Sequence, residues 1–510
     1  MTKRLFKGFR TEPAEADLAG QHLREILAVG RTIPAPRTGP ARADRSGTRA
    51  PVAPLLGWDE PYAGRAVTTA HPEVHRGDTG MVAGLYPFLH GATLPPIGAF
   101  MGYNVLTGRA FCCHPLLWVI EQIVSNPNVL ITGAPGAGKS GLVKALALRL
   151  IALGIRVLVA GDVKGEYTKL CRWLGVEPLQ LGPGLSGRLN PLDAGPLGER
   201  LEKIADPVEF KSRLTEIHRR RLSLLAALLE LQMRRPLLPE EAEAISLAVK
   251  EVTGQLAGNT RLTNPTLRAV HAVLLDPTPE MAWELRIRGE DIQTTRETVR
   301  SARAALGAMV DGHIGGIFDS ESSTALDWDA PIASVDISRM ESYGEDVVAM
   351  IMTCVSSWAQ AAVDQPSGPQ RLVIRDELWR VMNAGPAMVR KIDSDLRLSR
   401  NDGVCQVLTT HRLADFESVG AAGSAAVAIA RNMISSCDTR ITLAQDVRPL
   451  AEIQDAVGLT NAQVDLVSSW GRAHVGRALW SMGRAGSHAV QTHLTQIERE
   501  LFHTDEKMAV

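Results

Sequence analysis

The clearest order in the pattern of apolar and polar residues begins at Asn128. Residues 129–132 form a short apolar run that ends in a glycine-rich segment. Leucine and valine side chains then recur at helical spacing between 142 and 150, and a second run rich in β-branched residues covers 155–160. A strand, a loop, a helix and a second strand in this order predict one unit of a parallel sheet.

Further strands of the same sheet are expected downstream. Helical patterns over 346–363 and 388–398 separate some of them. The last two strands resemble an antiparallel addition at the edge of the sheet. The expected strands cover 331–337, 371–374, 404–409, 440–443, 473–478 and 487–491.

The remaining segments suggest a division of the chain. Between 199 and 307 the sequence has almost no strand pattern, and apolar residues fall mostly three and four positions apart, which predicts a helical insertion. Residues 32–54 are rich in Pro, Ala, Arg and Gly and predict a flexible linker. We therefore expect a flexible segment at 1–55, a small β-rich or loop module at 56–127, a core in two parts at 128–198 and 308–510, and the insertion at 199–307.

The expected fold class is thus α/β, with a mainly parallel sheet flanked by helices. The composition agrees with a globular protein, because 45% of the 510 residues are hydrophobic and 22% are charged. The 55 basic and 56 acidic residues give a net charge of -1, which argues against a polybasic nucleic-acid binder. No apolar run reaches the roughly 20 residues that span a bilayer, and the six cysteines lack zinc spacing, so we expect a cytoplasmic protein with reduced thiols.

The glycine-rich segment carries the strongest chemical signal. Its spacing, Gly-x4-Gly-Lys-Ser, is that of a P-loop, in which backbone N–H groups and a helix N-terminus surround phosphate oxygens. We expect Lys139 to reach the β- and γ-phosphates of ATP and Ser140 to ligate Mg²⁺. The residues expected to bind the nucleotide are Gly133, Ala134, Pro135, Gly136, Ala137, Gly138, Lys139, Ser140 and Gly141.

A P-loop needs carboxylates on a neighbouring strand, and the apolar run 371–374 leads into Asp376 and Glu377. We expect Asp376 to hold the Mg²⁺ shell and Glu377 to activate the attacking water. Asp162 and Glu166 follow the second strand at the same predicted edge, where ligands of α/β sheets bind. For Asp162, capping of the next helix is an alternative.

Three further residues are candidates for catalysis. His411 ends the strand after the acid pair and is expected to sense the γ-phosphate, although it could equally be an exposed loop histidine. Arg400 and Arg440 are candidates, with Arg397, for an arginine finger that reaches a neighbouring subunit, although most arginines are surface residues. The basic clusters at 218–221 and 234–235 could face DNA or an acidic partner, or simply solvent.

The order of these motifs resembles the HerA/FtsK superfamily, and within it the ATPases of type IV secretion and conjugative transfer (the VirB-four or TraC class), especially those of high-GC Gram-positive bacteria. The resemblance covers about 95–508. At His411 the superfamily more often has Gln. The segments that carry the resemblance are 128–140, 161–167, 188–193, 315–319, 376–377 and 492–505.

The resemblance implies a RecA-like ATPase core that works as a homo-oligomer, a hexamer, with Mg²⁺ and ATP. It implies a motor bound peripherally to the membrane proteins of a secretion complex, at the cytoplasmic face, that drives transfer of DNA or protein. Two alternatives stay open: a DNA translocase closer to HerA or FtsK, and a scaffold whose assembly depends on nucleotide but which hydrolyses little.

Overall fold

A computed structural model describes residues 94–503, except 202–203, 286–291, 313–314, 323–326, 364–367, 383–384, 412–415 and 417–424. The flexible segment expected at 1–55 and the first part of the module expected at 56–127 lie outside the described residues. Thr504 and Asp505, at the end of the closing motif, also lie outside them.

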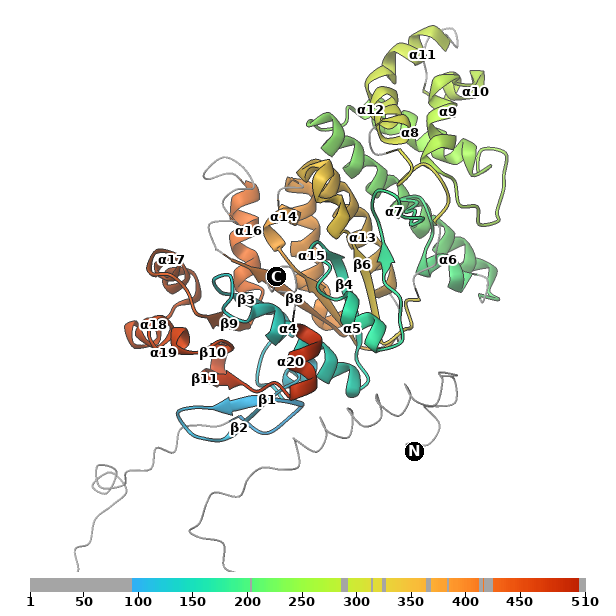
Figure 1. Ribbon diagram of the computed structural model, residues 1–510. Coiled ribbons are helices and arrows are strands. Elements are labelled where there is room, and N and C mark those ends of the chain that lie inside the picture. Colours follow the sequence, from blue (N-terminus) through green and yellow to red (C-terminus); the bar gives the residue numbers. More distant parts are fainter. Residues whose placement is uncertain are drawn as a thin grey trace, which may run out of the picture.

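Eleven strands form one mixed sheet in the order β2-β1-β11-β10-β9-β3-β8-β7-β4-β6-β5 (Figure 1). The seven strands from β9 to β5 are parallel, and the other four are antiparallel additions at one edge. The expected fold class, a mainly parallel sheet flanked by helices, is confirmed. The strands are β1 (Ala99–Asn104), β2 (Ala110–Cys113), β3 (Val129–Thr132), β4 (Arg156–Asp162), β5 (Leu179–Gln180), β6 (Ile332–Asp336), β7 (Arg371–Arg375), β8 (Val404–Thr410), β9 (Thr439–Leu443), β10 (Arg477–Met482) and β11 (Gly486–Thr492).

The central strands are apolar throughout because both of their faces are buried. In β3, Leu130 points into one core, whereas Val129 and Ile131 point into the other. One core lies between the sheet and the helices α3, α4, α5 and α20. The other lies between the sheet and α13 to α16 and continues into the insertion.

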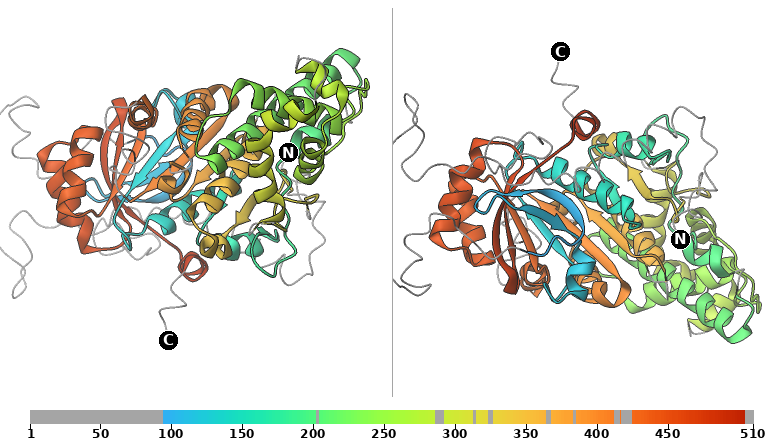
Figure 2. Two further views of the ribbon diagram at one scale, coloured as in Figure 1. Left: turned by 90° about the horizontal axis from the view of Figure 1, so that it is seen from above. Right: turned by 90° about the horizontal axis from the view of Figure 1, so that it is seen from below.

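The helices cover both faces of the sheet, and the insertion projects from one side of this body (Figure 2). Two 3₁₀ turns, η2 (Ser338–Tyr343) and η4 (Gly483–Ala485), add to them. The helices are α3 (Pro115–Ile120), α4 (Lys139–Ala152), α5 (Thr168–Trp173), α6 (Pro196–Leu201), α7 (Pro207–Met233), α8 (Pro239–Val252), α9 (Leu267–Leu275), α10 (Pro279–Glu284), α11 (Ile292–Thr298), α12 (Arg300–Asp311), α13 (Glu345–Val363), α14 (Leu378–Met382), α15 (Pro386–Asp402), α16 (Ala425–Ser435), α17 (Val447–Val457), α18 (Asn461–Ser468), α19 (Trp470–Ala473) and α20 (Gln496–Phe502).

The antiparallel edge differs from the sequence expectation in two respects. The strand expected at 473–478 is wrong in its bounds, because the short helix α19 ends at Ala473 and a turn with Gly476 at φ 81° precedes β10. Residues 99–113 fall within the stretch expected to form a small separate module, but they add β1 and β2 to the main sheet through pairing with β11. A contact between segments this far apart leaves no local pattern in the sequence.

Arg220, near the middle of α7, attaches the insertion to the core. It donates to the carbonyl oxygens of Asp193 and Ala194, at 2.7 and 3.2 Å. Arg221, which is buried, donates to Asn264 Oδ1 at 2.5 Å within the insertion, and Arg234, which follows α7, forms an exposed pair with Asp346 at 2.5 Å. These contacts give Arg220 and Arg221 of the basic cluster at 218–221 a structural role.

Two apolar features of the sequence are explained by burial. Among the described residues, α13 is the one helix long and apolar enough to cross a membrane, and 89% of its apolar window is buried inside the protein. Arg375 ends the apolar strand β7 because its guanidinium forms a buried ion pair with Asp395 at 2.8 Å and donates to Ser356 Oγ at 2.8 Å.

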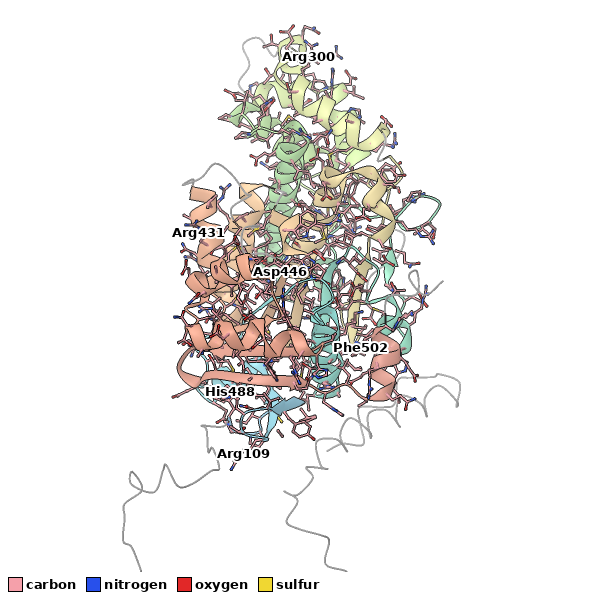
Figure 3. The ribbon with its side chains drawn as sticks, turned by 60° about the vertical axis from the view of Figure 1, so that its left-hand side comes forward. Arg109, Arg300, Arg431, Asp446, His488 and Phe502 are labelled. Atoms are coloured by element: carbon pink, nitrogen blue, oxygen red, sulfur yellow. The ribbon has the colours of Figure 1, made fainter. Side chains whose placement is uncertain are left out.

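A buried ion pair joins the P-loop helix α4 to the C-terminal helix α20. Arg149 donates to both carboxylate oxygens of Glu498, at 2.8 and 2.7 Å, and to the carbonyl oxygens of Phe100 and His493. The side chains of Arg149 and Glu498 are 4% and 0% exposed. Phe502, labelled at the end of α20 in Figure 3, packs into the same core.

We expect Glu498→Gln to lower the free energy of unfolding by about 3 kcal/mol, because it leaves a buried guanidinium without its counter-charge. Denaturant unfolding measures this change. The control is Glu177→Gln in the Arg172–Glu177 pair, whose side chains are 54% and 74% exposed and whose loss should cost less than about 1 kcal/mol. Equal effects of the two substitutions would contradict the structural role of Arg149.

Candidate active site

The candidate site lies at the edge of the sheet where β3, β8 and β7 end side by side. Thr132 at the end of β3 pairs with Thr410 of β8, and Arg375 at the end of β7 pairs with Leu408 of β8. Parallel strands end at the same edge, so the segments that follow them emerge together. These segments carry the glycine-rich loop, the acid pair and His411.

The glycine-rich loop connects β3 to α4 and has the strand–loop–helix context that a P-loop requires. Gly136 and Gly138 adopt left-handed backbone conformations, with φ of 77° and 98°. A Cβ atom on Gly138 would also lie 2.9 Å from the amide nitrogen of Gly476, in the turn before β10. Position 138 therefore requires glycine both for its backbone conformation and for the close approach of this turn.

Lys139 points back across the loop that it follows. Its ammonium donates to the carbonyl oxygens of Gly133 and Ala134, at 2.6 and 3.2 Å, and to His411 Nδ1 at 2.8 Å. Burial lowers the pKa of Lys139 to about 8, although the carboxylates of Glu377 and Asp376 oppose this shift. The ammonium thus contacts two carbonyl oxygens and a ring nitrogen, and the phosphates of a nucleotide can replace these acceptors.

Asp376 and Glu377 continue β7, and the backbone between them is strained. Glu377 has φ 49°, in the left-handed region, and its N–H donates to Asp376 Oδ1 at 3.0 Å and to Thr409 Oγ1 at 3.3 Å. Thr409 also donates its hydroxyl proton to Asp376 Oδ1. A non-glycine residue in this region costs about 1 kcal/mol or more, so the surrounding hydrogen bonds must hold it there.

Three side chains donate to the carboxylate of Glu377. Lys164 and His411 Nε2 both bind Oε1, the latter at 3.1 Å, and Trp379 Nε1 binds Oε2 at 2.7 Å. Burial alone would raise the pKa of Glu377, but the hydrogen bonds from His411 and Lys164 outweigh burial and hold it well below its ordinary value. The carboxylate is therefore charged, and two donors occupy Oε1 while one occupies Oε2.

His411 links the P-loop lysine to this carboxylate. Nδ1 must accept because the Lys139 ammonium can only donate, which leaves the proton on Nε2 for Glu377. The backbone oxygen of His411 accepts from the buried side chain of Gln445 at 3.0 Å. The structure thus places His411 between two site residues, where a γ-phosphate sensor is expected, and not on an isolated loop.

Asp162 holds the turn before α5 and does not cap the helix itself, whose N-cap residue is Tyr167. It is 2% exposed, and its two oxygens accept the backbone N–H groups of Glu166 and Tyr167, at 3.0 and 2.7 Å. Both carboxylate oxygens therefore hold the turn before α5, and we do not expect Asp162 to contact a nucleotide.

Glu166 lies nearer the site but is also paired. Its Oε2 lies 3.2 Å from Nζ of Lys144, a buried residue of α4. Burial, and less strongly the carboxylates of Glu377 and Glu166, raise the pKa of Asp376. Glu166 thus acts on the site through its charge and through its contact with the P-loop helix.

The two arginines proposed as fingers lie at the other end of the strands. Arg440 pairs in register with Leu130, and its guanidinium donates to the carbonyl oxygens of Cys437 and Ile434, at 3.0 and 3.3 Å. Arg400 Nη1 contacts the carbonyl oxygen of Ser125 at 3.3 Å, just before β3 begins. Neither arginine joins the site of its own chain, and Arg440 has a structural role.

The site also contains residues that the sequence analysis did not select. Lys164 could have been found, because it follows β4 at the same edge as the P-loop. Trp379 and Gln445 gave no signal, because their side chains reach the site only through the folding of α14 and of the segment after β9.

Asp376 and Ser140 supply a carboxylate and a hydroxyl, the oxygen ligands that Mg²⁺ prefers. In the part of the chain that the structure describes, no group of three or more His, Cys, Asp or Glu side chains could hold a metal ion. This sparse donor set fits Mg²⁺ bound mostly by phosphates and water.

No protein-family model and no curated protein matches the sequence, but solved structures match the fold. VirB4 of Thermoanaerobacter pseudethanolicus aligns over 80% of this chain and 100% of its own, with 20% sequence identity and a TM-score of 0.62. The chain has the VirB4 fold. The resemblance to the VirB-four class is thus confirmed at the level of the fold. The plasmid coupling protein TrwB, in complex with a non-hydrolysable ATP analogue, matches with 14% identity over 72% of this chain and 86% of its own, at a TM-score of 0.48.

The pKa of Lys139 predicts a pH dependence of nucleotide binding. Phosphates favour the ammonium form, so binding should raise the pKa of Lys139 above its value of about 8 in the free protein. At pH 9 about nine-tenths of the free protein has a neutral Lys139, so binding should take up roughly one proton and weaken about tenfold per pH unit. At pH 7 Lys139 is already mostly charged, so nucleotide binding should add almost no proton to it.

Calorimetry of ADP binding at pH 7 and pH 9, in two buffers of different ionisation enthalpy, measures the proton uptake. The control is Lys139→Arg, because arginine stays charged at both pH values. In this variant the proton uptake on ADP binding should be the same at pH 7 and pH 9. Equal proton uptake by the two proteins at pH 9 would show that Lys139 is not the titrating group.

Proposed function

We propose that this chain is a Mg²⁺-dependent ATPase that powers a conjugative or type IV-like secretion system. The observation that carries the proposal is the continuous line of hydrogen bonds from Lys139 through His411 to Glu377. It joins a phosphate-binding lysine to a carboxylate that can act as a general base.

The side chains have distinct parts in the proposed reaction. Lys139 leaves the loop carbonyls and binds the β- and γ-phosphate oxygens, and the N–H groups of the P-loop bind the same phosphates. Glu377 accepts a proton from a water molecule while the oxygen of that water attacks the γ-phosphorus. The bond between the γ-phosphorus and the oxygen that bridges the β- and γ-phosphates then breaks, which gives ADP and phosphate. Asp376 and Ser140 would hold Mg²⁺, which neutralises charge on the phosphates.

His411 couples the position of Lys139 to the hydrogen bonding of Glu377. When Lys139 turns to the phosphates, Nδ1 of His411 loses its donor, and the ring can accept a proton or bind another donor there. Because Nε2 contacts Glu377, this change alters the hydrogen bonding of the base directly.

The proposal of a transfer motor rests on the VirB4 fold together with the order of motifs along the chain. In this proposal the chain assembles into a ring, a hexamer, on the cytoplasmic face of the secretion complex, contacts its membrane proteins and moves DNA or protein. An arginine finger would come from a neighbouring subunit, since Arg400 and Arg440 do not reach the site of their own chain.

We expect Glu377→Gln to reduce ATP hydrolysis about 100-fold or more while nucleotide still binds, because only the proton acceptor is lost. Lys139→Ala should lose both hydrolysis and tight binding. A phosphate-release assay and fluorescent-nucleotide binding measure the two effects. The control is Glu452→Gln, on an exposed position of α17, which should change neither.

The same assays distinguish the competing functions. Unchanged hydrolysis in Lys139→Ala would overturn the assignment of the active site, and a slow rate that Glu377→Gln barely changes would favour a scaffold. Stimulation of hydrolysis many-fold by double-stranded DNA, with a steep salt dependence, would favour a DNA translocase over a secretion motor.

A further inference from the structure

Lys164 forms an ion pair with Glu377, the residue that the proposed reaction needs as its general base. It lies in the turn between β4 and α5, and its ammonium forms an ion pair with Oε1 of Glu377. The side chain of Glu377 is 8% exposed, whereas that of Lys164 is 50% exposed. An ion pair of this kind joins a fixed, buried acceptor to a cation that solvent and ligands can reach.

With this ion pair in place, Glu377 is a poor base. Lys164 and His411 both bind Oε1, and Trp379 binds Oε2. A general base needs a free lone pair directed at the water and a pKa that is not far below the working pH. Lys164 and His411 fill both acceptor positions of Oε1, so one of them must leave before this oxygen can accept a proton from water.

Lys164 is the donor most able to leave. The backbone of His411 is held by the buried side chain of Gln445, and Trp379 stacks with Arg380 at 4.8 Å. The backbone around Lys164 is also fixed, because Asp162 binds the N–H groups that follow it and Gly165 packs against Ser338. The side chain of Lys164, however, is long and half-exposed, so it can rotate while its backbone stays fixed.

A γ-phosphate offers Lys164 a stronger partner. Lys164 and Lys139 lie close enough for the charge of Lys164 to add to the burial that lowers the pKa of Lys139. An anion that binds both lysines removes this repulsion, and a terminal phosphate carries more negative charge than a carboxylate. A nucleoside diphosphate lacks the phosphate that would reach Lys164.

We propose that Lys164 is a catalytic residue that moves between two anions. Without nucleotide or with a diphosphate it holds Glu377 and blocks proton transfer. With a triphosphate it binds the γ-phosphate, frees Oε1 of Glu377 for the attacking water and stabilises charge on the transferred group. The proposal rests on the proposed ATPase function and adds a mechanism that makes the base available only when the γ-phosphate is present.

The test is a double-mutant cycle of ATP affinity with Lys164→Met, Glu377→Gln and the double variant of the full chain. If ATP breaks the Lys164–Glu377 pair, Glu377→Gln removes the cost of breaking it, but only where Lys164 is present. The gain in ATP affinity from Glu377→Gln should then be about tenfold larger in the background with Lys164 than in Lys164→Met. ADP affinity should show no such coupling.

Additive effects of the two substitutions on ATP affinity would overturn the proposal, because a lysine that stays on Glu377 gives additive effects. Coupling of the same size for ADP would also overturn it. A failure of the wild-type chain to bind any nucleotide would instead refute the proposed function, so the two failures are distinguishable.

Steady-state kinetics supply the second measurement. Lys164→Met should lower kcat about tenfold or more, and Lys164→Arg, which retains the cation, should restore part of the loss. A purely structural role for Lys164 would lower thermal stability and would not couple Lys164 to Glu377 in ATP affinity.

Discussion

The parallel pairing of β3, β8 and β7 is the constraint on which the candidate site depends. It brings Lys139, Glu377 and His411 to one edge, although Lys139 and His411 are 272 positions apart in the sequence. Backbone hydrogen bonds fix the register, and packing on both faces of the sheet fixes the register again, because a slip of one residue would exchange the two cores. The site therefore inherits its geometry from the most buried part of the protein.

The unfavourable features of the fold are concentrated at this edge. Glu377 has a left-handed backbone, Lys139 is a partly buried cation, and Asp376 is a partly buried acid. Each of these conditions is compensated by hydrogen bonds that involve another member of the site, such as Thr409 for the acid pair. Such a cluster is stable without ligand, and yet several of its hydrogen bonds can be exchanged for bonds to an anion.

The sequence predicted those parts of the structure that depend on neighbouring residues or on the general geometry of parallel sheets. The P-loop spacing and the apolar run before Asp376 located two segments of the site. His411 was added because it ends the strand after the acid pair, and parallel strands end at the same edge of a sheet. Contacts between distant side chains could not be predicted in this way. The ion pairs of Arg375 and Arg149, the hydrogen bonds of Asp162 to the turn before α5 and the pairing of β1 with β11 each depend on a partner more than 15 residues away or on a turn whose direction has no sequence signature. Arg440 lies at the start of its strand and Arg400 near the end of the helix before β8, so both lie at the opposite end of the strands from the P-loop.

The length of α7 has a mechanical consequence. Its 27 residues span about 40 Å, and Arg220 near its middle donates to carbonyl oxygens of the core. Its neighbour α13 packs against β4, the strand that leads to Lys164. A rotation of the helix by about 10° about the Arg220 contact would move an end about 20 Å away by about 3.5 Å. A rearrangement of one side chain's size beside the sheet can in this way become a displacement of the insertion large enough to shift a bound partner.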